Sequence, residues 1–205
     1  MKKLSSAADV SGSSSPFPSP FTAYLAAKGF LDDLLVGLGD DALEVRGRLV
    51  LARGLPRRAA WAQNIWESPA FIPIESIGDG ARKLSAIQRN WHLHSEEHHR
   101  RAALIQEKLP HVSEKPLRFG DPAPTAPLGS WTLWEPGLIL ASARCSSPFP
   151  DGEVRFHENK IDPPSRAYLK LWDCLLYTSP PGNPNRRLRI NGDWSIGTRH
   201  RLCKA

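Results

Sequence analysis

The alternation of apolar and polar positions predicts short helices and strands behind a polar leader. Residues 1–20 are rich in Ser and Pro and hold almost no large apolar side chains, so we expect them to be disordered. Over 21–38 large apolar residues recur at a helix-like spacing, and we expect a helix that Gly29 weakens or splits. Residues 42–51 alternate in part, with Gly47 placed to turn the chain between two short strands.

Tryptophans mark the next stretch. Trp61, Ile65 and Trp66 lie at or beside helical spacing, and residues 70–74 form a short apolar run that is typical of a strand. Large aromatic side chains usually belong to a core, and we favour that interpretation. The alternative is a platform on which unpaired bases stack, as in proteins that bind single-stranded nucleic acid.

The middle of the chain continues the mixed pattern. We expect a helix over 81–89, a strand over 90–94, and a second helix that Ser95 caps and that ends before Pro110. Residues 110–127 carry five prolines, too many for regular structure, and predict a linker or a packed loop.

Two apolar runs follow the proline-rich stretch. Residues 131–134 and 138–143 predict a hairpin around Pro136-Gly137, and residues 149–152 predict a further turn. Taken together, the order of elements predicts an α+β fold with antiparallel strand pairs, and it contains no internal repeat.

The composition is that of a soluble globular protein, with 40% hydrophobic and 23% charged residues among 205. No run approaches the ~18 apolar residues of a membrane span, and the leader lacks the apolar region of a secretory signal, so we expect no membrane partner. Three widely spaced cysteines, Cys145, Cys174 and Cys203, favour a reducing, cytoplasmic location over a disulfide scaffold.

The net charge of +6 comes almost entirely from the end of the chain. Six basic residues and one acidic residue lie within 175–205, which leaves 21 of the 27 basic and 20 of the 21 acidic residues elsewhere. The overall charge therefore says little about what the body of the protein binds.

Four histidines, His92, His94, His98 and His99, cluster near two glutamates. His94 and His98 are about one helical turn apart, and such a pair can share a metal ion. The spacing does not match His-Glu-x-x-His, however, and no third ligand is recognisable. We therefore favour a solvated, histidine-rich helix start and expect no bound metal.

Residues 163–166 read Pro-Pro-Ser-Arg and predict the start of a helix, because proline cannot continue a preceding helix and Ser165 is a good N-cap. An apolar stripe follows on one face of that helix. Arg166 and Lys170 lie one turn apart on the other side. On this pattern alone the segment is a surface helix with solvated basic residues.

The same segment resembles the Pro-Ser-Arg-x-x-x-Lys-Leu signature that opens the catalytic domain of FtsJ-family ribose 2′-O-methyltransferases. Upstream lie Gly-Leu-Ile-Leu-Ala-Ser-Ala at 137–143 and Ser-Ser-Pro-Phe-Pro at 146–150. They follow the order seen in the branch that methylates cytidine in large-subunit ribosomal RNA. The resemblance is strong over 131–173 and weak before it.

This resemblance implies S-adenosylmethionine as cofactor and ribosomal RNA as partner. It implies that Lys170 is the first lysine of a catalytic Lys-Asp-Lys-Glu set, where its charge orients the hydroxyl and the phosphate. Arg166, with Ser165 beside it, is expected to contact an RNA phosphate. By analogy, 21–130 is an RNA-binding α+β domain, and 131–173 carries strands and the first helix of a Rossmann-like methyltransferase domain.

The cofactor site that the family requires is not in this sequence. The glycine-rich Asp-Leu-Gly-x-x-Pro-Gly-Gly turn does not occur, and the other three catalytic residues have no candidates. Residues 174–179 resemble the translation of a transposon end used as a sequencing adapter. We therefore expect 174–205 to be non-native or disordered, and the chain to be an inactive N-terminal part of the enzyme. The alternative is a genuine arginine-rich arm that binds RNA electrostatically.

Two other functions compete with the enzyme fragment. One is a stand-alone RNA-binding module without catalysis, in which Arg166 and Lys170 grip phosphates. The weaker one is a metal-binding protein that uses the histidine cluster.

Overall fold

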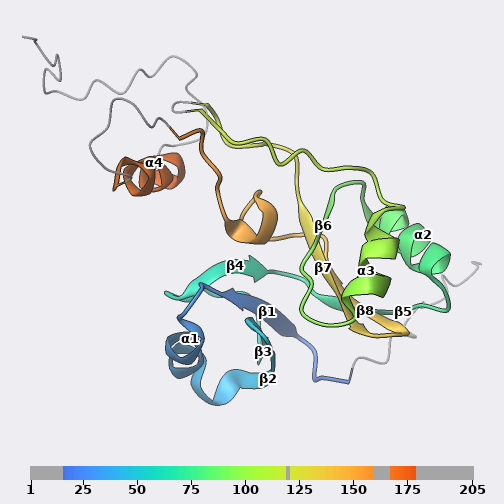
Figure 1. The fold of residues 1–205 in the computed structure, drawn as a ribbon. Helices are drawn as coiled ribbons and strands as arrows, with labels where there is room; N and C mark the ends of the chain where they lie inside the picture. The colour runs from blue at the N-terminus through green and yellow to red at the C-terminus, as the bar shows by residue number, and fades with distance from the viewer. Residues whose placement is uncertain (1–15, 119–120, 159–166, 179–205) are drawn as a thin grey trace, which may run out of the picture.

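The computed structural model describes residues 16–118, 121–158 and 167–178 of the chain. This part forms four α-helices and two four-stranded sheets rich in antiparallel pairs, which confirms the predicted α+β class (Figure 1). In chain order the elements are β1 (Phe21–Ala26), α1 (Leu31–Leu38), the 3-10 turn η1 (Gly39–Asp41), β2 (Ala42–Arg46), β3 (Leu49–Arg53), β4 (Ala62–Trp66), β5 (Ala70–Pro73), α2 (Ile77–Ile87), β6 (Trp91–Leu93), α3 (His99–Gln106), β7 (Gly129–Glu135), β8 (Leu138–Ser142), the 3-10 turn η2 (Pro150–Gly152) and α4 (Ala167–Thr178).

The first sheet has the order β2-β3-β1-β4, and every neighbouring pair is antiparallel. All six residues of the inner strand β1 are buried. A strand that is covered on both faces shows no alternation of apolar and polar residues. For this reason the helix expected over 21–38 is wrong for Phe21–Ala26, and the chain becomes helical only after Gly29, as α1.

The hairpin predicted around Gly47 is present as β2 and β3. Gly47 has a φ of +54°, which glycine adopts without steric cost. A Cβ atom at this position would lie 2.0 Å from the Glu96 carboxylate. The turn therefore needs glycine both for its backbone angle and for its close approach to the connection between β6 and α3.

The strand β4 corrects the helical interpretation of Trp61, Ile65 and Trp66, because this segment pairs with β1. Trp66 is completely buried, as expected for a core aromatic. Trp61 precedes the strand and stacks on Phe30, with ring centroids 4.5 Å apart. The next strand, predicted over 70–74, is confirmed as β5.

The second sheet has the order β5-β8-β7-β6, in which β6 runs parallel to β7 and the other pairs are antiparallel. The helices α2 and α3 cover one face of this sheet (Figure 1). Leu84 of α2 and Ile105 of α3 pack there against Trp91 and Trp131. The hairpin predicted around Pro136-Gly137 is confirmed as β7 and β8.

Both helices predicted in this half are present, but they start at other residues. α2 starts at Ile77 rather than at residue 81, because the Ser76 side chain caps it with a 3.1 Å hydrogen bond. α3 starts at His99 rather than directly after Ser95. The Ser95 hydroxyl lies 2.6 Å from Nδ1 of His99 instead of binding a backbone amide, and His98 occupies the N-cap position.

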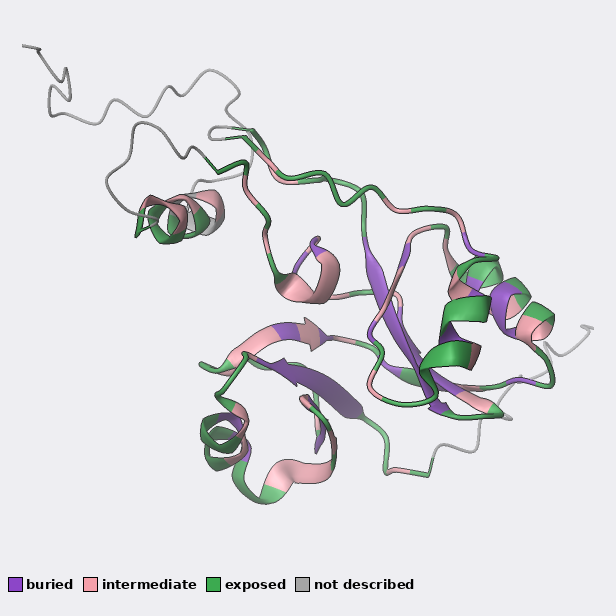
Figure 2. Cartoon of the chain, viewed as in Figure 1, coloured by how far each residue is buried: buried purple, intermediate pink, exposed green. Residues whose placement is uncertain are grey.

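The two sheets share a hydrophobic core. Buried residues from both fill the space between them: Leu25, Leu51 and Trp66 from the first sheet, and Phe71, Trp134 and Leu140 from the second. Figure 2 shows that burial concentrates in the strands, whereas α1 and α3 keep an exposed outer face. The domain boundary expected between residues 130 and 131 falls inside β7, so strands on both sides of it belong to one sheet.

The leader expected over 1–20 is described only from residue 16 onward. Phe17 packs against Phe71, with ring centroids 5.8 Å apart. The packed body therefore begins before residue 21.

The helix predicted after Ser165 is present as α4, although Ser165 itself lies outside the described residues. Trp172 of α4 packs edge-on against Phe156, with ring centroids 5.7 Å apart. The helix continues to Thr178, so the change of sequence character expected at residue 174 is not a change of secondary structure. Among the described helices, none is long and apolar enough to cross a membrane.

Candidate functional site

The three residues singled out by the family resemblance are only partly described. Lys170 lies exposed on α4, and within the described residues its side chain makes no hydrogen bond or ion pair. Ser165 and Arg166 lie outside those residues. Of the residues predicted to contact RNA, only Lys170 is therefore described, and its ammonium group lies in solvent on a helix.

The histidine cluster divides into two parts. His98 and His99 are exposed at the start of α3, as the solvated interpretation predicts. His94 is only 4% exposed, so that interpretation is wrong for this residue. Over 16–118, 121–158 and 167–178 no three His, Cys, Asp or Glu side chains are arranged to hold a metal ion.

His94 lies between two carboxylates. Its Nδ1 is 2.9 Å from Oδ1 of Asp151, and its Nε2 is 2.9 Å from Oε1 of Glu96. Because carboxylates only accept hydrogen bonds, both ring nitrogens must donate, and the imidazole is then a cation. The same Glu96 oxygen also accepts the backbone N–H of Arg48 at 3.2 Å, so the cluster ties down the β2–β3 turn.

Local backbone geometry places the Asp151 carboxylate. Asp151 sits in η2 with a φ of 51°, a left-handed conformation that Asp tolerates better than most residues. Gly152 follows with a φ of +75°, and a Cβ atom there would lie 2.2 Å from the Gln63 carbonyl oxygen of β4. The glycine lets η2 approach β4 closely enough for Asp151 to reach His94.

The cluster shifts the pKa values of both His94 and Asp151 in the directions that favour an ion pair. Burial disfavours the charged imidazole, but the hydrogen bonds and charges of Asp151 and Glu96 outweigh it and raise the pKa of His94. Burial would also raise the pKa of Asp151, yet hydrogen bonds from His92 and His94 hold it well below its usual range. With both nitrogens occupied, His94 is a structural cation rather than a general base.

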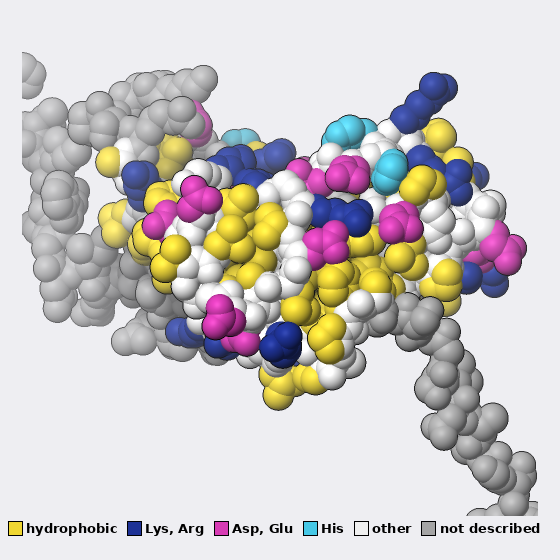
Figure 3. Space-filling model, turned by 90° about the horizontal axis from the view of Figure 1, so that it is seen from below, with side chains coloured by type: hydrophobic (Ala, Val, Ile, Leu, Met, Phe, Trp, Pro, Cys, Tyr) yellow, Lys and Arg dark blue, Asp and Glu magenta, His cyan; other side chains and the backbone are white. Residues whose placement is uncertain are grey.

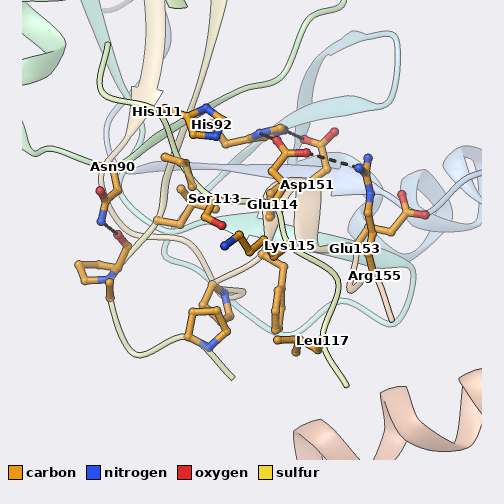
Figure 4. A pocket seen from close by; sticks show the side chains of 18 residues that line it. Asn90, His92, His111, Ser113, Glu114, Lys115, Leu117, Asp151, Glu153 and Arg155 are labelled. Carbon is orange, nitrogen blue, oxygen red and sulfur yellow. Dashed lines mark hydrogen bonds and ion pairs between the residues drawn. The ribbon is translucent and has the colours of Figure 1, made fainter. Parts of the chain in front are cut away.

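A cavity of about 300 Å³ opens beside this cluster (Figure 4). It lies between residues 111–117, 124–128 and 148–155. The apolar part of its lining includes Pro124, Pro127, Leu128, Pro148, Phe149 and Pro150.

His92 joins the cluster to the cavity. Its Nε2 is 3.4 Å from Oδ1 of Asp151, and its Nδ1 is 3.8 Å from Oε1 of Glu114. Asn90, His111, Ser113 and Lys115 add further polar groups to the lining. Figure 4 shows Lys115 between the polar side chains of His92 and Asp151 and the apolar side near Leu117.

Each acidic residue of the cavity is already paired. Asp151 faces His92 and His94, Glu114 lies 3.5 Å from Arg155, and Glu153 lies 3.0 Å from Lys28. Lys115, in contrast, has no ion pair within the described part of the chain. The group left for an incoming ligand is therefore a cation next to an apolar surface.

The partly buried thiol of Cys145 is not set up as a nucleophile. Burial raises its pKa to about 11, so it stays protonated near neutral pH.

Sequence reasoning missed both Asp151 and the cavity. Asp151 is predicted only as part of a turn, and the prolines of 110–127 only as a linker or packed loop. A useful signal was the density of prolines before and after the β7–β8 hairpin, since rigid extended segments on both sides of a hairpin can line a cavity.

Comparisons of the chain with protein-family models, with curated proteins and with solved structures gave no match. Any function must therefore be argued from the sequence motif and from the geometry of the site.

Proposed function

We propose that the chain is the N-terminal part of an S-adenosylmethionine-dependent methyltransferase that acts on the ribose 2′-hydroxyl of large-subunit ribosomal RNA. In this proposal the two-sheet body binds RNA, and Lys170 is the first catalytic lysine. The observation that carries it is the Pro-Ser-Arg-x-x-x-Lys-Leu motif, whose second half lies in α4 with Lys170 exposed.

Two features of α4 support this role. Trp172 packs on Phe156, so one side of the helix contacts the segment that follows η2. Lys170 stays in solvent, where a protonated amine is available to a phosphate or a ribose hydroxyl. A cation near the hydroxyl would stabilise the negative charge that develops on its oxygen during methyl transfer.

The proposal requires that the cofactor bind through sequence beyond this motif. The glycine-rich turn that would admit S-adenosylmethionine is not among the 205 residues. We therefore expect no heat of binding when S-adenosylmethionine is titrated into this chain. We also propose a cytoplasmic location, on the grounds of three widely spaced cysteines.

The native gene provides the sharpest test. If the proposal is correct, the DNA downstream of codon 173 encodes an Asp-x-Gly-x-x-Pro-Gly-Gly turn soon after the motif. An uninterrupted native gene that encodes residues 174–205 as they stand and then stops would refute the assignment to a methyltransferase.

RNA binding tests the role of Lys170. We expect a ribosomal RNA fragment to bind the chain and to keep most of its affinity when residues 175–205 are removed. Lys170→Ala should weaken binding by several-fold and reduce the salt dependence by about one phosphate contact. Lys108→Ala is the matched control, because Lys108 is also exposed on the body but lies outside the motif.

One observation favours the second candidate, a stand-alone RNA-binding module. The three hydrophobic clusters of the described residues include no residue of α4. A body whose hydrophobic core needs no residue of α4 could bind RNA without a catalytic domain. RNA affinity that is unchanged by Lys170→Ala would favour this candidate over the enzyme fragment.

A further inference from the structure

The cavity beside His92 combines three properties that point to one kind of ligand. It has an apolar wall that includes prolines and Phe149, hydrogen-bonding groups, and one cation, Lys115, that forms no ion pair with the residues the structure describes. A flat ring with polar edges fits such a wall and such groups, and an anion fits the lysine. Nucleotides carry both features.

The charged residues around the cavity also favour a ligand that carries a phosphate. Asp151, Glu114 and Glu153 are each neutralised by a histidine, an arginine or a lysine, at distances of 2.9, 3.5 and 3.0 Å. Within the part of the chain that the structure describes, Arg155 pairs only with Glu114, and its side chain is 68% exposed, so it can turn toward a second anion. The ion pairs thus leave the lysine side of the cavity attractive to phosphate.

The hydrogen-bonding groups are available for the edge of a base. The Asn90 amide nitrogen donates to the Pro127 carbonyl at 3.4 Å, which leaves its own carbonyl oxygen as an acceptor. The Ser113 hydroxyl has no hydrogen-bond partner within the described residues. An acceptor and a hydroxyl in the lining suit a nucleobase, which presents both donors and acceptors.

The cavity is open to solvent on its polar side. His111, Ser113 and Lys115 are all exposed, so its polar side faces solvent. A volume of about 300 Å³ lies at the lower end of the range for small-molecule sites. It therefore suits a single nucleotide whose neighbours remain outside. On the face shown in Figure 3, basic and acidic side chains are interspersed with apolar ones rather than gathered into a continuous basic surface.

We propose that this cavity binds one unpaired nucleotide of an RNA strand, with the base against the prolines and Phe149 and a phosphate near Lys115. The inference rests on the proposed function, in which the body binds RNA. It adds the place on the body where the RNA binds and the single-stranded form in which it is bound. Phosphate attraction and base burial act together, so duplex RNA, whose bases are stacked inside the helix, should not enter the cavity.

Two variants of exposed residues test the site without removing core contacts. Lys115→Ala removes the cation, and Ala126→Trp places a large ring in the cavity that Ala126 lines. Their matched controls are Lys108→Ala and Ala103→Trp, which make the same changes at exposed positions in or just after α3 and outside the cavity lining. Thermal unfolding of all four variants checks that each is folded.

Fluorescence anisotropy of a labelled single-stranded RNA oligonucleotide, with the full chain, is the measurement. One base stack is worth on the order of tenfold in affinity, so Ala126→Trp should weaken binding by about tenfold. Lys115→Ala should weaken binding by several-fold and lower the slope of the salt dependence by about one. Both controls should bind like the unmodified chain, and uridine monophosphate should compete weakly.

The possible failures separate the two proposals. If the unmodified chain binds no RNA, the proposed function falls and this inference falls with it. If it binds RNA but Ala126→Trp and Lys115→Ala bind as tightly, only the cavity assignment is overturned. Equal affinity for duplex and single-stranded RNA, or tighter binding of the free mononucleotide than of the strand, would also overturn it.

Discussion

His94 and Asp151 form a buried ion pair, in which Nδ1 of the imidazole lies 2.9 Å from Oδ1 of the carboxylate. Glu96 faces the other ring nitrogen at 2.9 Å and also accepts the Arg48 amide from the β2–β3 turn. The cluster links three parts of the chain: the β2–β3 turn of the first sheet, the connection that follows β6, and the turn η2. We therefore expect this ion pair to stabilise the junction between the two sheets.

Stability should depend on pH through this pair. The folded-state pKa of His94 is raised, so its contribution is complete below about pH 6.5 and is lost as the pH rises through the folded value. The folded-state pKa of Asp151 is lowered, so its contribution is complete above about pH 4 and is lost as the pH falls. Urea unfolding across a pH series should show a maximum between these limits.

His98→Gln provides the control for the alkaline side, because His98 is exposed and outside the cluster. This variant should keep the decline of stability above neutral pH. A free energy of unfolding that rises steadily from pH 6 to pH 9 in the unmodified chain would contradict the role of His94.

Asp151→Asn should destabilise the protein by about 3 kcal/mol at pH 6, the lower end of the cost of breaking a buried pair. The lower end applies because the Asp151 side chain is 26% exposed and solvent compensates part of the loss. Asn tolerates the left-handed φ of 51°, so the variant changes the charge without straining the backbone.

Denaturant unfolding at fixed pH measures this loss, and Glu107→Gln removes one exposed carboxylate as a control. The control should stay within about 0.5 kcal/mol of the unmodified chain. An equally small change for Asp151→Asn would show that the ion pair contributes little to the fold.

Features set by neighbouring residues could be predicted from the sequence. The hairpins at Gly47 and at Pro136-Gly137 follow from turn chemistry, and α2 and β5 follow from local pattern. The strand β1 could not be predicted this way. Its six buried residues are apolar except for Thr22 and do not alternate, and only the place of the strand between β3 and β4 distinguishes it from a buried helix.

The candidate site was less accessible to sequence reasoning. His94 and Asp151 are 57 positions apart, and no local spacing relates them. The cavity is lined by irregular segments around 111–117 and 148–155, whose approach depends on the bridge between Leu117 and Phe156. Lys170, in contrast, was identified by a motif alone, and the structure adds that it is exposed.

Cys145 should react slowly with thiol reagents. Burial raises its pKa to about 11, so at pH 7 only about one thiol in ten thousand is a thiolate. Mass spectrometry after brief alkylation should find Cys174, which is exposed, labelled well before Cys145. In denaturant the two thiols should be labelled at similar rates, whereas equal labelling of the folded chain would contradict the raised pKa of Cys145.

Gly47→Ala should destabilise the protein beyond the cost of its backbone angle alone. At Gly47, with φ +54°, the new Cβ would meet the Glu96 carboxylate at 2.0 Å and push it away from His94 and the Arg48 amide. In a Glu96→Ala background that carboxylate is gone, so Gly47→Ala then measures the cost of the positive φ alone. The loss of stability in urea unfolding should therefore be larger in the unmodified chain than in the Glu96→Ala background. Equal losses in the two backgrounds would mean that Glu96 moves aside without cost, and that its contacts do not hold the sheets together.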